Sequence, residues 1–365
     1  MSIRRLSLTN FRNIKGADLE TDSPFVVFYG DNAAGKTSVL EAVHLLLAGR
    51  SFRTRESSKL IAQGENQTFV SALIERHQLG TSRSSNDPAI YRIDGANTTI
   101  PEIARQFPVQ VFDNRIFDLF EGPPKLRRQL LDWGVFHVKQ EFYFHWQAYQ
   151  HAVKQRNTLL KKTRVDRSQI AAWDHELIRH GQLLHDQRSS YAGQLVEACE
   201  KSELLKDMEL RFSYFPGWNI REFPDFKEAL FSAANSRDLQ YKRTTVGPHQ
   251  ADLRIQLQTR KAGDVLSRGQ KKLAGFGIKL AQVKMYNEAL DKKCILLCDD
   301  FSAELDEHNQ KRILNYMHEL GSQVFVTSIE SQEIQKLLTS YPESLQLFHV
   351  KQGQVVPSSE GFIKI

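Results

Sequence analysis

Apolar and polar residues alternate with a period of two in the N-terminal quarter of the chain. This pattern, typical of half-buried β-strands, occurs in "IRRLSLTNF" and again in "YRIDG". The short apolar run "PFVVFYG" is bounded by turn-forming residues, as is typical of a buried strand. After it, apolar residues recur at helical spacing from Val39 to Leu47, and Gly49 follows the last of them. The N-terminal quarter therefore predicts strands around one helix.

The middle of the chain carries two long stripes of apolar residues at alternating steps of four and three. The stripe in residues 140–163 is interrupted only by Arg156, and the stripe in residues 169–198 is interrupted by His180 and Gln187. The polar stretch "TRVDRSQ" lies between them. Two such helices with a short polar connection predict an antiparallel helical hairpin.

The last third of the chain returns to strand patterns. An irregular, aromatic-rich stretch, "RFSYFPGW", precedes them. The strands "ADLRIQLQ", "KCILLCDD" and "SQVFVTS" then alternate with helical patterns at 269–290 and 306–320, which is an α/β arrangement. The simplest architecture is a lobe made from residues 1–124 and 245–365, with a helical lobe inserted at 125–244.

Composition limits the class of protein. The 365 residues are 41% hydrophobic, enough for more than one lobe, yet no stretch approaches the roughly 20 apolar residues that span a bilayer. The N-terminus becomes polar before a signal-peptide core could form. Three cysteines, Cys199, Cys294 and Cys298, argue against a disulfide framework and a zinc site and favour a reducing compartment. A cytoplasmic protein is expected.

Positive charge is concentrated in the middle of the chain. The formal net charge is +6, and the segment from Lys125 to Arg188 alone has twelve Lys and Arg against six Asp and Glu. The same segment contains six of the twelve histidines. A basic stretch of this kind indicates either a polyanionic partner, most often nucleic acid, or a solvated helix surface. Charge alone does not decide between them.

The stretch "GDNAAGKT" fits the phosphate-binding pattern G-x-x-x-x-G-K-[ST]. The glycines let backbone N–H groups close around phosphate oxygens, Lys36 is placed for the β- and γ-phosphates, and Thr37 offers its hydroxyl to Mg²⁺. The pattern lies between a predicted strand and a predicted helix, as this chemistry requires. The expected nucleotide-binding residues of the loop are Gly30, Asp31, Asn32, Ala33, Ala34, Gly35, Lys36 and Thr37.

The stretch "CILLCDDFSAELD" supplies the acidic partner of the loop, because an apolar strand ends there in two aspartates. Asp299 is expected to hold Mg²⁺, directly or through water. Asp300, one position further, is expected to orient or deprotonate the attacking water, with Lys36 as the other catalytic group. The predicted cofactors are therefore ATP and Mg²⁺.

The stretch "DVLSRGQKKLAGFGIKLA" resembles the signature loop of ATP-binding-cassette (ABC) ATPases. In those proteins the signature serine and the start of the following helix bind the γ-phosphate of ATP held by another subunit, since a helix N-terminus favours anions. The resemblance assigns this role to Ser267, Gly269 and Gln270. It also implies a D-loop at "SAELD", residues 302–306, and a head-to-tail homodimer with two ATP molecules between the subunits.

Taken in order along nearly the whole chain, the motifs resemble the RecF/SMC branch of these ATPases, and the RecF family most closely. "LTNFRN", "PVQVFD", "GPPKLRRQLLDW" and "TTVGPHQAD" complete the set. The resemblance implies an ABC-type P-loop ATPase head with an inserted helical lobe. It further implies that Arg12 lies toward the nucleotide. Gln110 would be the Q-loop residue, with a part in catalysis and in the Mg²⁺ site.

The resemblance also implies a function. A RecF-like protein would bind DNA, both duplex and single-stranded, at junctions as an ATP-dependent dimer with weak DNA-stimulated ATPase activity. It would act in recombinational repair, replication-fork recovery and the SOS response. RecR would be its direct partner, with RecO and RecA acting through it in RecA loading, and no membrane would be involved.

Two departures from the family pattern and three alternatives stay open at this point. Gln250 stands where the family usually has arginine after "GPH", and Thr327 or Ser328 stands where transporter ATPases have a histidine. The alternatives are a transporter ATPase subunit, an SMC-like tether with short arms, and an ATPase of a defence system. The missing histidine and the basic insert disfavour the first, and the short insert disfavours the second.

Overall fold

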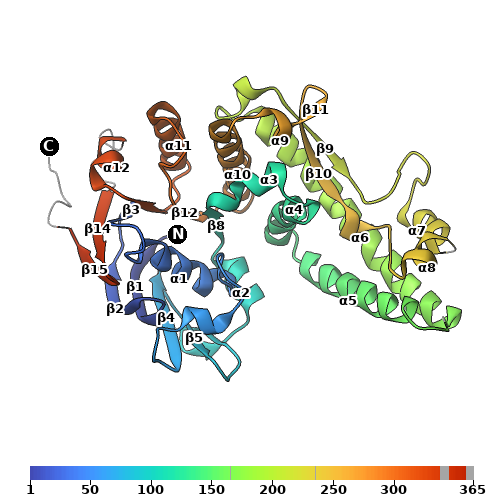
Figure 1. Cartoon of the computed structure of the whole chain (residues 1–365), viewed down its shortest axis with the longest axis horizontal. Coiled ribbons are helices and arrows are strands. Elements are labelled where there is room, and N and C mark those ends of the chain that lie inside the picture. The colour runs from blue at the N-terminus through green and yellow to red at the C-terminus, as the bar shows by residue number, and fades with distance from the viewer. Residues whose placement is uncertain (165, 235, 338–344, 359–365) are drawn as a thin grey trace. The chain divides into compact units, whose positions relative to one another are not determined.

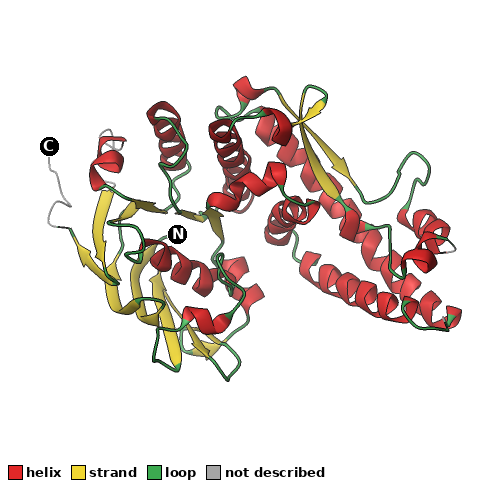
Figure 2. Cartoon of the chain, viewed as in Figure 1, coloured by secondary structure: helices red, strands yellow, loops and turns green. Residues whose placement is uncertain are grey.

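The chain folds into two compact units, seen in a computed structural model that describes residues 1–164, 166–234, 236–337 and 345–358. Residues 1–116 and 268–365 form the first, which we name the head unit, and residues 117–267 form the second, the insert unit. Figure 1 follows the chain through both units by colour. Figure 2 shows that the insert unit is mainly helical, whereas the head unit contains the larger sheets.

The head unit contains two six-stranded sheets. The first is antiparallel and has the order β2-β1-β4-β5-β6-β7. Its strands are β1 (Ile3–Phe11), β2 (Ile14–Glu20), β4 (Gln67–Ile74), β5 (His77–Ser84), β6 (Ile90–Ile93) and β7 (Ala96–Asn97). The second has the order β15-β14-β3-β13-β12-β8 and is parallel except for β15. Its strands are β3 (Phe25–Tyr29), β8 (Val109–Phe112), β12 (Ile295–Cys298), β13 (Val324–Ser328), β14 (Leu345–Lys351) and β15 (Gln354–Pro357).

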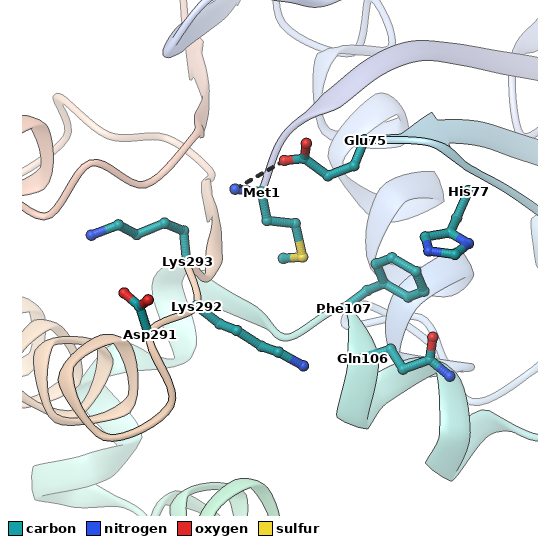
Figure 3. A pocket seen from close by; sticks show the side chains of 8 residues that line it. All are labelled: Met1, Glu75, His77, Gln106, Phe107, Asp291, Lys292 and Lys293. Carbon is teal, nitrogen blue, oxygen red and sulfur yellow. Dashed lines mark ion pairs between the residues drawn. The ribbon is translucent and has the colours of Figure 1, made fainter.

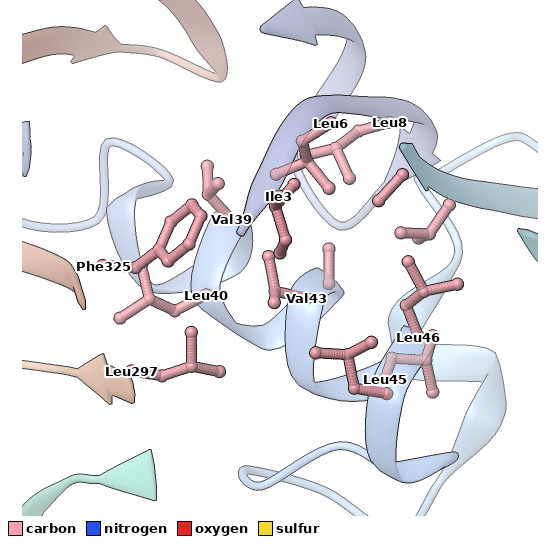
Figure 4. Packing of buried hydrophobic residues seen from close by; sticks show 14 of the residues in the cluster. Ile3, Leu6, Leu8, Val39, Leu40, Val43, Leu45, Leu46, Leu297 and Phe325 are labelled. Atoms are coloured by element: carbon pink, nitrogen blue, oxygen red, sulfur yellow. The ribbon is translucent and has the colours of Figure 1, made fainter. Parts of the chain in front are cut away.

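Helix α1 (Lys36–Ala48) lies at the centre of the head core, and eleven of its thirteen residues are buried. Figure 4 shows Val39, Leu40 and Val43 of this helix among side chains from β1 and from the parallel sheet. Such a helix is apolar nearly all round because it is covered on several sides rather than one. The phosphate-binding pattern therefore stands at the start of a helix that the core fixes firmly.

Two of the remaining helices of the head unit were predicted from the sequence, and the others were not. The remaining helices are α2 (Ile100–Gln106), α10 (Arg268–Leu290), α11 (Glu307–Glu319) and α12 (Ser331–Leu337), with short 3₁₀ turns η1 (Ser57–Leu60) and η2 (Asn114–Phe117). α10 and α11 match the helical patterns predicted at 269–290 and 306–320. The predicted α/β fold of an ABC-type head, made from both ends of the chain, is confirmed.

The insert unit is organised around a helical hairpin. Its helices are α3 (Asp118–Glu121), α4 (Pro124–Val138), α5 (Phe142–Leu160), α6 (Arg167–Glu200), α7 (Phe226–Ala234), α8 (Arg237–Tyr241) and α9 (Ala262–Val265). α5 and α6 pack together as predicted and are antiparallel, since His145 pairs with His180 near one end and Arg156 with Asp174 near the other. The stripe of aromatic residues on α5 and α6 packs inside this unit.

The polar residues that interrupt the two apolar stripes are part of this packing. Arg156 is completely buried and donates to Asp174 and Asp238, and His180 is bonded to His145. A buried charge or imidazole is tolerated in a core when it is paired. Arg156 and His180 therefore make specific polar contacts and do not face solvent. Gln187 is half-buried, and its Oε1 has no hydrogen-bond partner in the described residues.

The insert unit is larger than predicted, because it includes a small antiparallel sheet. It spans residues 117–267, whereas the prediction was 125–244. The strands are β9 (Leu210–Phe215), β10 (Asp252–Leu257) and β11 (Arg260–Lys261), and 3₁₀ turns lie at η3 (Lys206–Met208) and η4 (Pro248–Gln250). β10 was expected in the head lobe, but it pairs with β9 over its whole length. The interpretation of "RFSYFPGW" as irregular is wrong for its first half, because alternating residues of β9 are half-buried.

Candidate functional site

The loop between β3 and α1 has the backbone that a phosphate-binding loop needs. Gly30 and Gly35 have φ values of 142° and 121°, and Ala33 has a φ of 62°. A Cβ on Gly30 would lie 2.2 Å from the carbonyl oxygen of Val350, so only glycine fits there. Asp31, Asn32 and Ala33 are exposed at the tip of the loop, whereas Ala34 is buried.

Lys36 is folded back over this loop. Its Nζ donates to the carbonyl oxygens of Gly30, at 2.6 Å, and of Asp31, at 2.9 Å. The side chain is only 6% exposed, and burial lowers the pKa of its ammonium group, while nearby Asp300, Asp299 and Asp31 oppose that shift. A cation bonded only to loop carbonyls is available to a phosphate that enters the loop.

Thr37 and Asp299 meet although 262 positions separate them in the sequence. Thr37 Oγ1 donates to Asp299 Oδ1 at 2.8 Å, and Thr327 Oγ1 donates to the same oxygen at 2.9 Å. Burial raises the pKa of Asp299, and the two hydroxyl donors oppose that rise. The predicted metal residues are thus brought together as a hydroxyl and a carboxylate, which are hard oxygen ligands suited to Mg²⁺.

Asp300 is exposed, but its backbone is held on both sides. Its N–H donates to Thr327 Oγ1 at 2.9 Å, its carbonyl oxygen accepts from Lys272 Nζ at 2.9 Å, and its φ is 49°. A non-glycine residue with this φ costs energy and marks a constrained position. The carboxylate of Asp300 is therefore presented from a fixed backbone beside Asp299.

Asn13 and Lys272, which the motifs did not single out, and Thr327, which was left open, shape the site. Asn13 donates to the carbonyl oxygen of Ala34 at 2.9 Å and accepts from Ser38 at 3.1 Å, which ties the loop to the end of β1. Thr327, left open above, supports Asp299 and Asp300 from β13. Lys272 also donates to the carbonyl oxygen of Ala303, at 2.5 Å. Asn13 and Lys272 stand next to residues that the sequence did single out, yet no spacing rule identifies them.

Two predicted residues have other partners in this structure. Arg12 makes a bidentate ion pair with the fully buried Glu41 of α1, at 2.9 Å and 2.6 Å. The Gln110 side chain is buried and donates to Gln282 of α10 at 3.1 Å. Neither is joined to Thr37 or Asp299 by a hydrogen bond in the described part of the chain.

The signature residues stand at the start of α10. Gly269 and Gln270 lie in its first turn, and Ser267 directly precedes it as the last residue of the insert unit. A Cβ on Gly269 would lie 3.0 Å from the carbonyl oxygen of Glu304. Arg268 pairs with Glu304 at 2.7 Å. The signature helix and the D-loop segment therefore pack against each other within the head unit.

The "GPHQ" stretch lies in the insert unit. Gln250 is exposed. His249 Nδ1 lies 2.8 Å from Tyr149 Oη, and the Pro248 carbonyl oxygen accepts from Arg188 at 2.7 Å. Burial lowers the pKa of His249 to about 4, so the ring is neutral. The contacts with Tyr149 and Arg188 fix the stretch, and Gln250 lies at the surface.

Other candidate sites are weak. The three cysteines are free and buried, and the described residues contain no cluster of three or more His, Cys, Asp or Glu able to hold a metal ion. None of the described helices is long and apolar enough to cross a membrane. Figure 3 shows a pocket of about 340 Å³ in the head unit, where the N-terminal ammonium pairs with Glu75 at 3.1 Å. None of the predicted site residues lines that pocket.

Comparison with known proteins shows the family. The model of the RecF/RecN/SMC N terminal domain matches residues 2–354. The DNA replication and repair protein RecF of Acinetobacter baumannii (strain ATCC 17978) is 39% identical over 359 residues, covering 97% of this chain and 99% of that protein. The RecF of Pseudomonas entomophila is 37% identical, covering 99% of each chain.

Solved structures agree with this. The recombination mediator protein RecF with ATPrS, described as part of the RecFOR pathway, has a TM-score of 0.86 at 26% identity, covering 98% of each chain. An Smc head bound to the C-winged helix domain of ScpA has a TM-score of 0.56 at 16% identity and shares the fold. The chain therefore belongs to the RecF family of DNA replication and repair proteins, as its motifs predicted.

Proposed function

We propose that this protein is an ATP-dependent DNA-binding protein of recombinational repair and replication-fork recovery. The observation that carries the proposal is the hydrogen bond between Thr37 and Asp299 at the mouth of a glycine loop that begins a buried helix. Loop N–H groups and Lys36 would take the phosphates of ATP. The RecF relatives with solved structures include complexes with ATP.

Mg²⁺ would be held by Thr37 and Asp299, the hydroxyl and carboxylate oxygens that already converge. When bound, it would neutralise charge on the phosphates. Asp300 would orient or deprotonate water, since its backbone is fixed and its side chain is exposed. Arg12 and Gln110 would have to leave Glu41 and Gln282 to take the roles that the resemblance gives them. Hydrolysis would serve as a switch, with weak turnover stimulated by DNA.

The active form would be a head-to-tail homodimer. Ser267, Gly269 and Gln270 at the start of α10 would face the γ-phosphate held by the loop of the partner subunit. The packing of α10 on the 299–304 segment supports this, because a change at the signature would be transmitted to Asp300 through Lys272. Such an arrangement explains why one chain contains both a phosphate-binding loop and a separate signature loop.

The proposed partners follow from charge and from the relatives. The net charge of +6 suits DNA, with single-strand/double-strand junctions as the proposed target. RecR would be the direct protein partner, and RecO and RecA would act through it, since the solved relative is a mediator of the RecFOR pathway. We place the protein in the cytoplasm at the nucleoid.

The variant Ser267→Arg tests the shared site. A bulky cation at the signature would block the partner's γ-phosphate while leaving each subunit's own loop intact. ATP binding to the monomer should stay normal, and ATP-induced dimerisation in sedimentation velocity and ATP hydrolysis should both be lost. Ser189→Arg, on the exposed face of α6, is the matched control. A Ser267→Arg protein with full hydrolysis and an ATP-induced dimer would overturn the shared site.

A further inference from the structure

The basic middle of the chain does not form one continuous basic surface. Several of its cations are used inside the insert unit: Arg127 pairs with Asp252, Arg188 with Asp132, and Arg156 with two aspartates. Arg156 and Arg188 are almost completely buried. Their charges are neutralised within the fold and are unavailable to a partner. The exposed positive charge must therefore be located residue by residue.

One group of exposed cations lies at the end of the helical hairpin. Lys161 and Lys162 follow the last residue of α5, and Arg164 and Arg167 stand before and at the start of α6. Asp166 is the one acidic residue between them. It caps α6 by accepting from the N–H of Ser168 at 2.9 Å and of Gln169 at 3.3 Å. Its carboxylate is therefore partly satisfied by the start of the helix.

A second group of cations lies beside the first, although 69 positions (168–236) separate the two groups in the sequence. Arg237, Lys242 and Arg243 are exposed on and after α8. α8 is fixed to the last turns of α5, because Arg156 donates to Asp238 at 2.6 Å and Asn157 accepts from the N–H of Thr244 at 2.6 Å. Figure 1 shows α8 near the end of α5.

The two groups lie within reach of one nucleic acid strand. α5 ends three residues after Asn157, about 5 Å along the helix axis at 1.5 Å per residue. The residues 161–164 continue directly from that end, while Lys242 and Arg243 directly precede Thr244. Both groups therefore contain cations within a few residues of the contact between Asn157 and Thr244 at the hairpin end.

These cations make no close ion pair with an acidic side chain in the described residues, although the pKa of Asp166 is lowered by its hydrogen bond from Ser168 and, to a smaller extent, by the charge of Lys162. No ion pair joins the seven Lys and Arg side chains of residues 161–167 and 237–243 to a carboxylate there, and the acid within the second group, Asp238, is buried on Arg156. Elsewhere in the same unit exposed lysines do pair, as Lys201 does with Glu197 and Lys206 with Glu203. Like charges placed together repel one another, so this cluster suits a polyanion.

An exposed aromatic side chain stands among the cations. Tyr241 is 57% exposed and is directly followed by Lys242 and Arg243. Single-stranded nucleic acid is bound by cations along its backbone and by aromatic rings on which bases stack. An exposed ring directly beside cations suits a single strand, because its unpaired bases can stack on the ring. The combination favours unpaired nucleotides.

We propose that the hairpin-end surface, meaning the exposed Lys and Arg of residues 161–167 and 237–243 together with Tyr241, binds single-stranded DNA. Its phosphates lie on the two groups of cations and a base stacks on Tyr241. The proposal rests on the proposed function and adds to it where the single-stranded side of a junction is held. Because Arg156 fixes α8 to α5, the surface is formed before DNA arrives, and little ordering accompanies binding.

The test compares three charge-removing variants, each lacking three cations. The first carries Lys161→Gln, Lys162→Gln and Arg164→Gln, and the second carries Arg237→Gln, Lys242→Gln and Arg243→Gln. The control carries Lys201→Gln, Lys206→Gln and Arg211→Gln, which are exposed in the same unit. Binding of a labelled 30-nucleotide oligo-dT is followed by fluorescence anisotropy, with ATP, across a salt series.

Each hairpin-end triple should bind oligo-dT at least tenfold more weakly than the control at fixed salt. Its log–log salt slope should fall by about 2, since each contact with a single strand contributes about 0.7. Tyr241→Ala should weaken oligo-dT binding about fivefold or more with an unchanged slope and should leave blunt duplex binding unchanged. Tyr241→Phe should retain wild-type binding. ATP hydrolysis without DNA, unchanged in every variant, verifies folding.

Several outcomes overturn the proposal. Hairpin-end triples that match the control in affinity and slope would place the DNA elsewhere, and the proposed function would stand because the wild type still binds. Triples that bind DNA normally but lose RecR would identify the surface as a protein-binding one. If Tyr241→Ala binds oligo-dT as tightly as the wild type, no base stacks on Tyr241 and that part of the proposal is wrong. A wild type that binds no DNA with ATP would overturn the proposed function as well.

Discussion

Two buried cations, one in each unit, differ in the groups to which they are bonded. Lys36 in the head unit donates only to the carbonyl oxygens of its own loop. Arg156 in the insert unit donates to two carboxylates, of Asp174 and Asp238, and to the hydroxyl of Thr244. Both side chains are at most 6% exposed. The first has neutral partners, and the second faces two carboxylates.

The difference separates a binding cation from a structural one. A buried charge bonded only to carbonyls gains from an incoming anion, because phosphate oxygens make stronger, charge-assisted hydrogen bonds. A buried arginine between two carboxylates gains nothing from an anion and would leave two uncompensated charges if removed. Lys36 and Arg156 are alike in burial and in charge. Only their hydrogen-bond partners show that the first can bind an anion and that the second stabilises the fold.

Replacing Lys36 by methionine should have the largest effect of the variants considered, and the quantity it should change is the affinity for ATP. Loss of the charge-assisted hydrogen bonds should reduce the affinity for Mg²⁺·ATP by roughly 10² to 10⁴-fold. ATP-dependent dimerisation and DNA binding should disappear with it. Isothermal titration calorimetry measures the affinity, and Lys59→Met, an exposed lysine of the same unit, is the control.

The free energy of unfolding is the second measurement on the Lys36→Met protein. Because burial already disfavours the charged ammonium group, as its lowered pKa indicates, its removal should change stability by no more than about 1 kcal/mol. A large loss of stability with nearly normal ATP affinity would show that Lys36 is structural and would break the comparison.

Arg156→Met should have the opposite pattern. Two carboxylates left buried without their cation should destabilise the insert unit by about 3–5 kcal/mol. All four tryptophans lie in that unit, at 133, 146, 173 and 218, so fluorescence during urea unfolding reports on it directly. Mg²⁺·ATP affinity should stay within about twofold of wild type. Arg179→Met, an exposed arginine on the neighbouring helix, controls for loss of charge.

The sequence predicted best where chemistry depends on contiguous residues. The loop from Gly30 to Thr37 carries its glycines, its lysine and its hydroxyl within eight positions, and the adjacent strand and helix patterns fixed its place. The hairpin followed from two apolar stripes. Even the contact of Thr37 with Asp299 was anticipated, because a loop and an acidic strand end of this type meet at one edge of a parallel sheet.

Contacts between distant segments could not be predicted from spacing. Asn13, in the turn after β1 of the antiparallel sheet, supports Ala34, which follows β3 of the parallel sheet. Thr327 supports Asp299 because β13 and β12 are neighbours in the parallel sheet. α8 joins the hairpin end because Arg156, which looked like a mere interruption of a stripe, pairs with Asp238. Likewise β10 belongs to the insert unit because it pairs with β9. A period-two pattern predicts a strand but does not specify its partner strand.

The smallest effect concerns His249, which fixes the "GPHQ" stretch beneath the hairpin. Its Nδ1 is bonded to Tyr149, its Nε2 lies 3.1 Å from the carbonyl oxygen of Thr244, and burial lowers its pKa to about 4. In the unfolded chain the pKa is about 6.5. The unfolded state therefore binds more protons between these values, and stability is complete above about pH 6.5 and falls as the pH drops toward 4. At pH 5 the loss should be about 2 kcal/mol.

His249→Asn separates this contribution from the other groups that titrate. An amide can replace the ring's hydrogen bonds but carries no proton, so the variant should lose about 2 kcal/mol less than the wild type between pH 7.5 and pH 5. His180 and His185, whose pKa values are also lowered by burial, contribute equally to both proteins and cancel in the difference. Tryptophan fluorescence during urea unfolding at the two pH values gives the measurement. Identical pH dependence in the two proteins would mean that His249 is solvated in the native state. The stretch from Thr244 to Gln250 would then depend on its other contacts, among them those of Thr244 with Arg156 and Asn157 and that of the Pro248 carbonyl oxygen with Arg188.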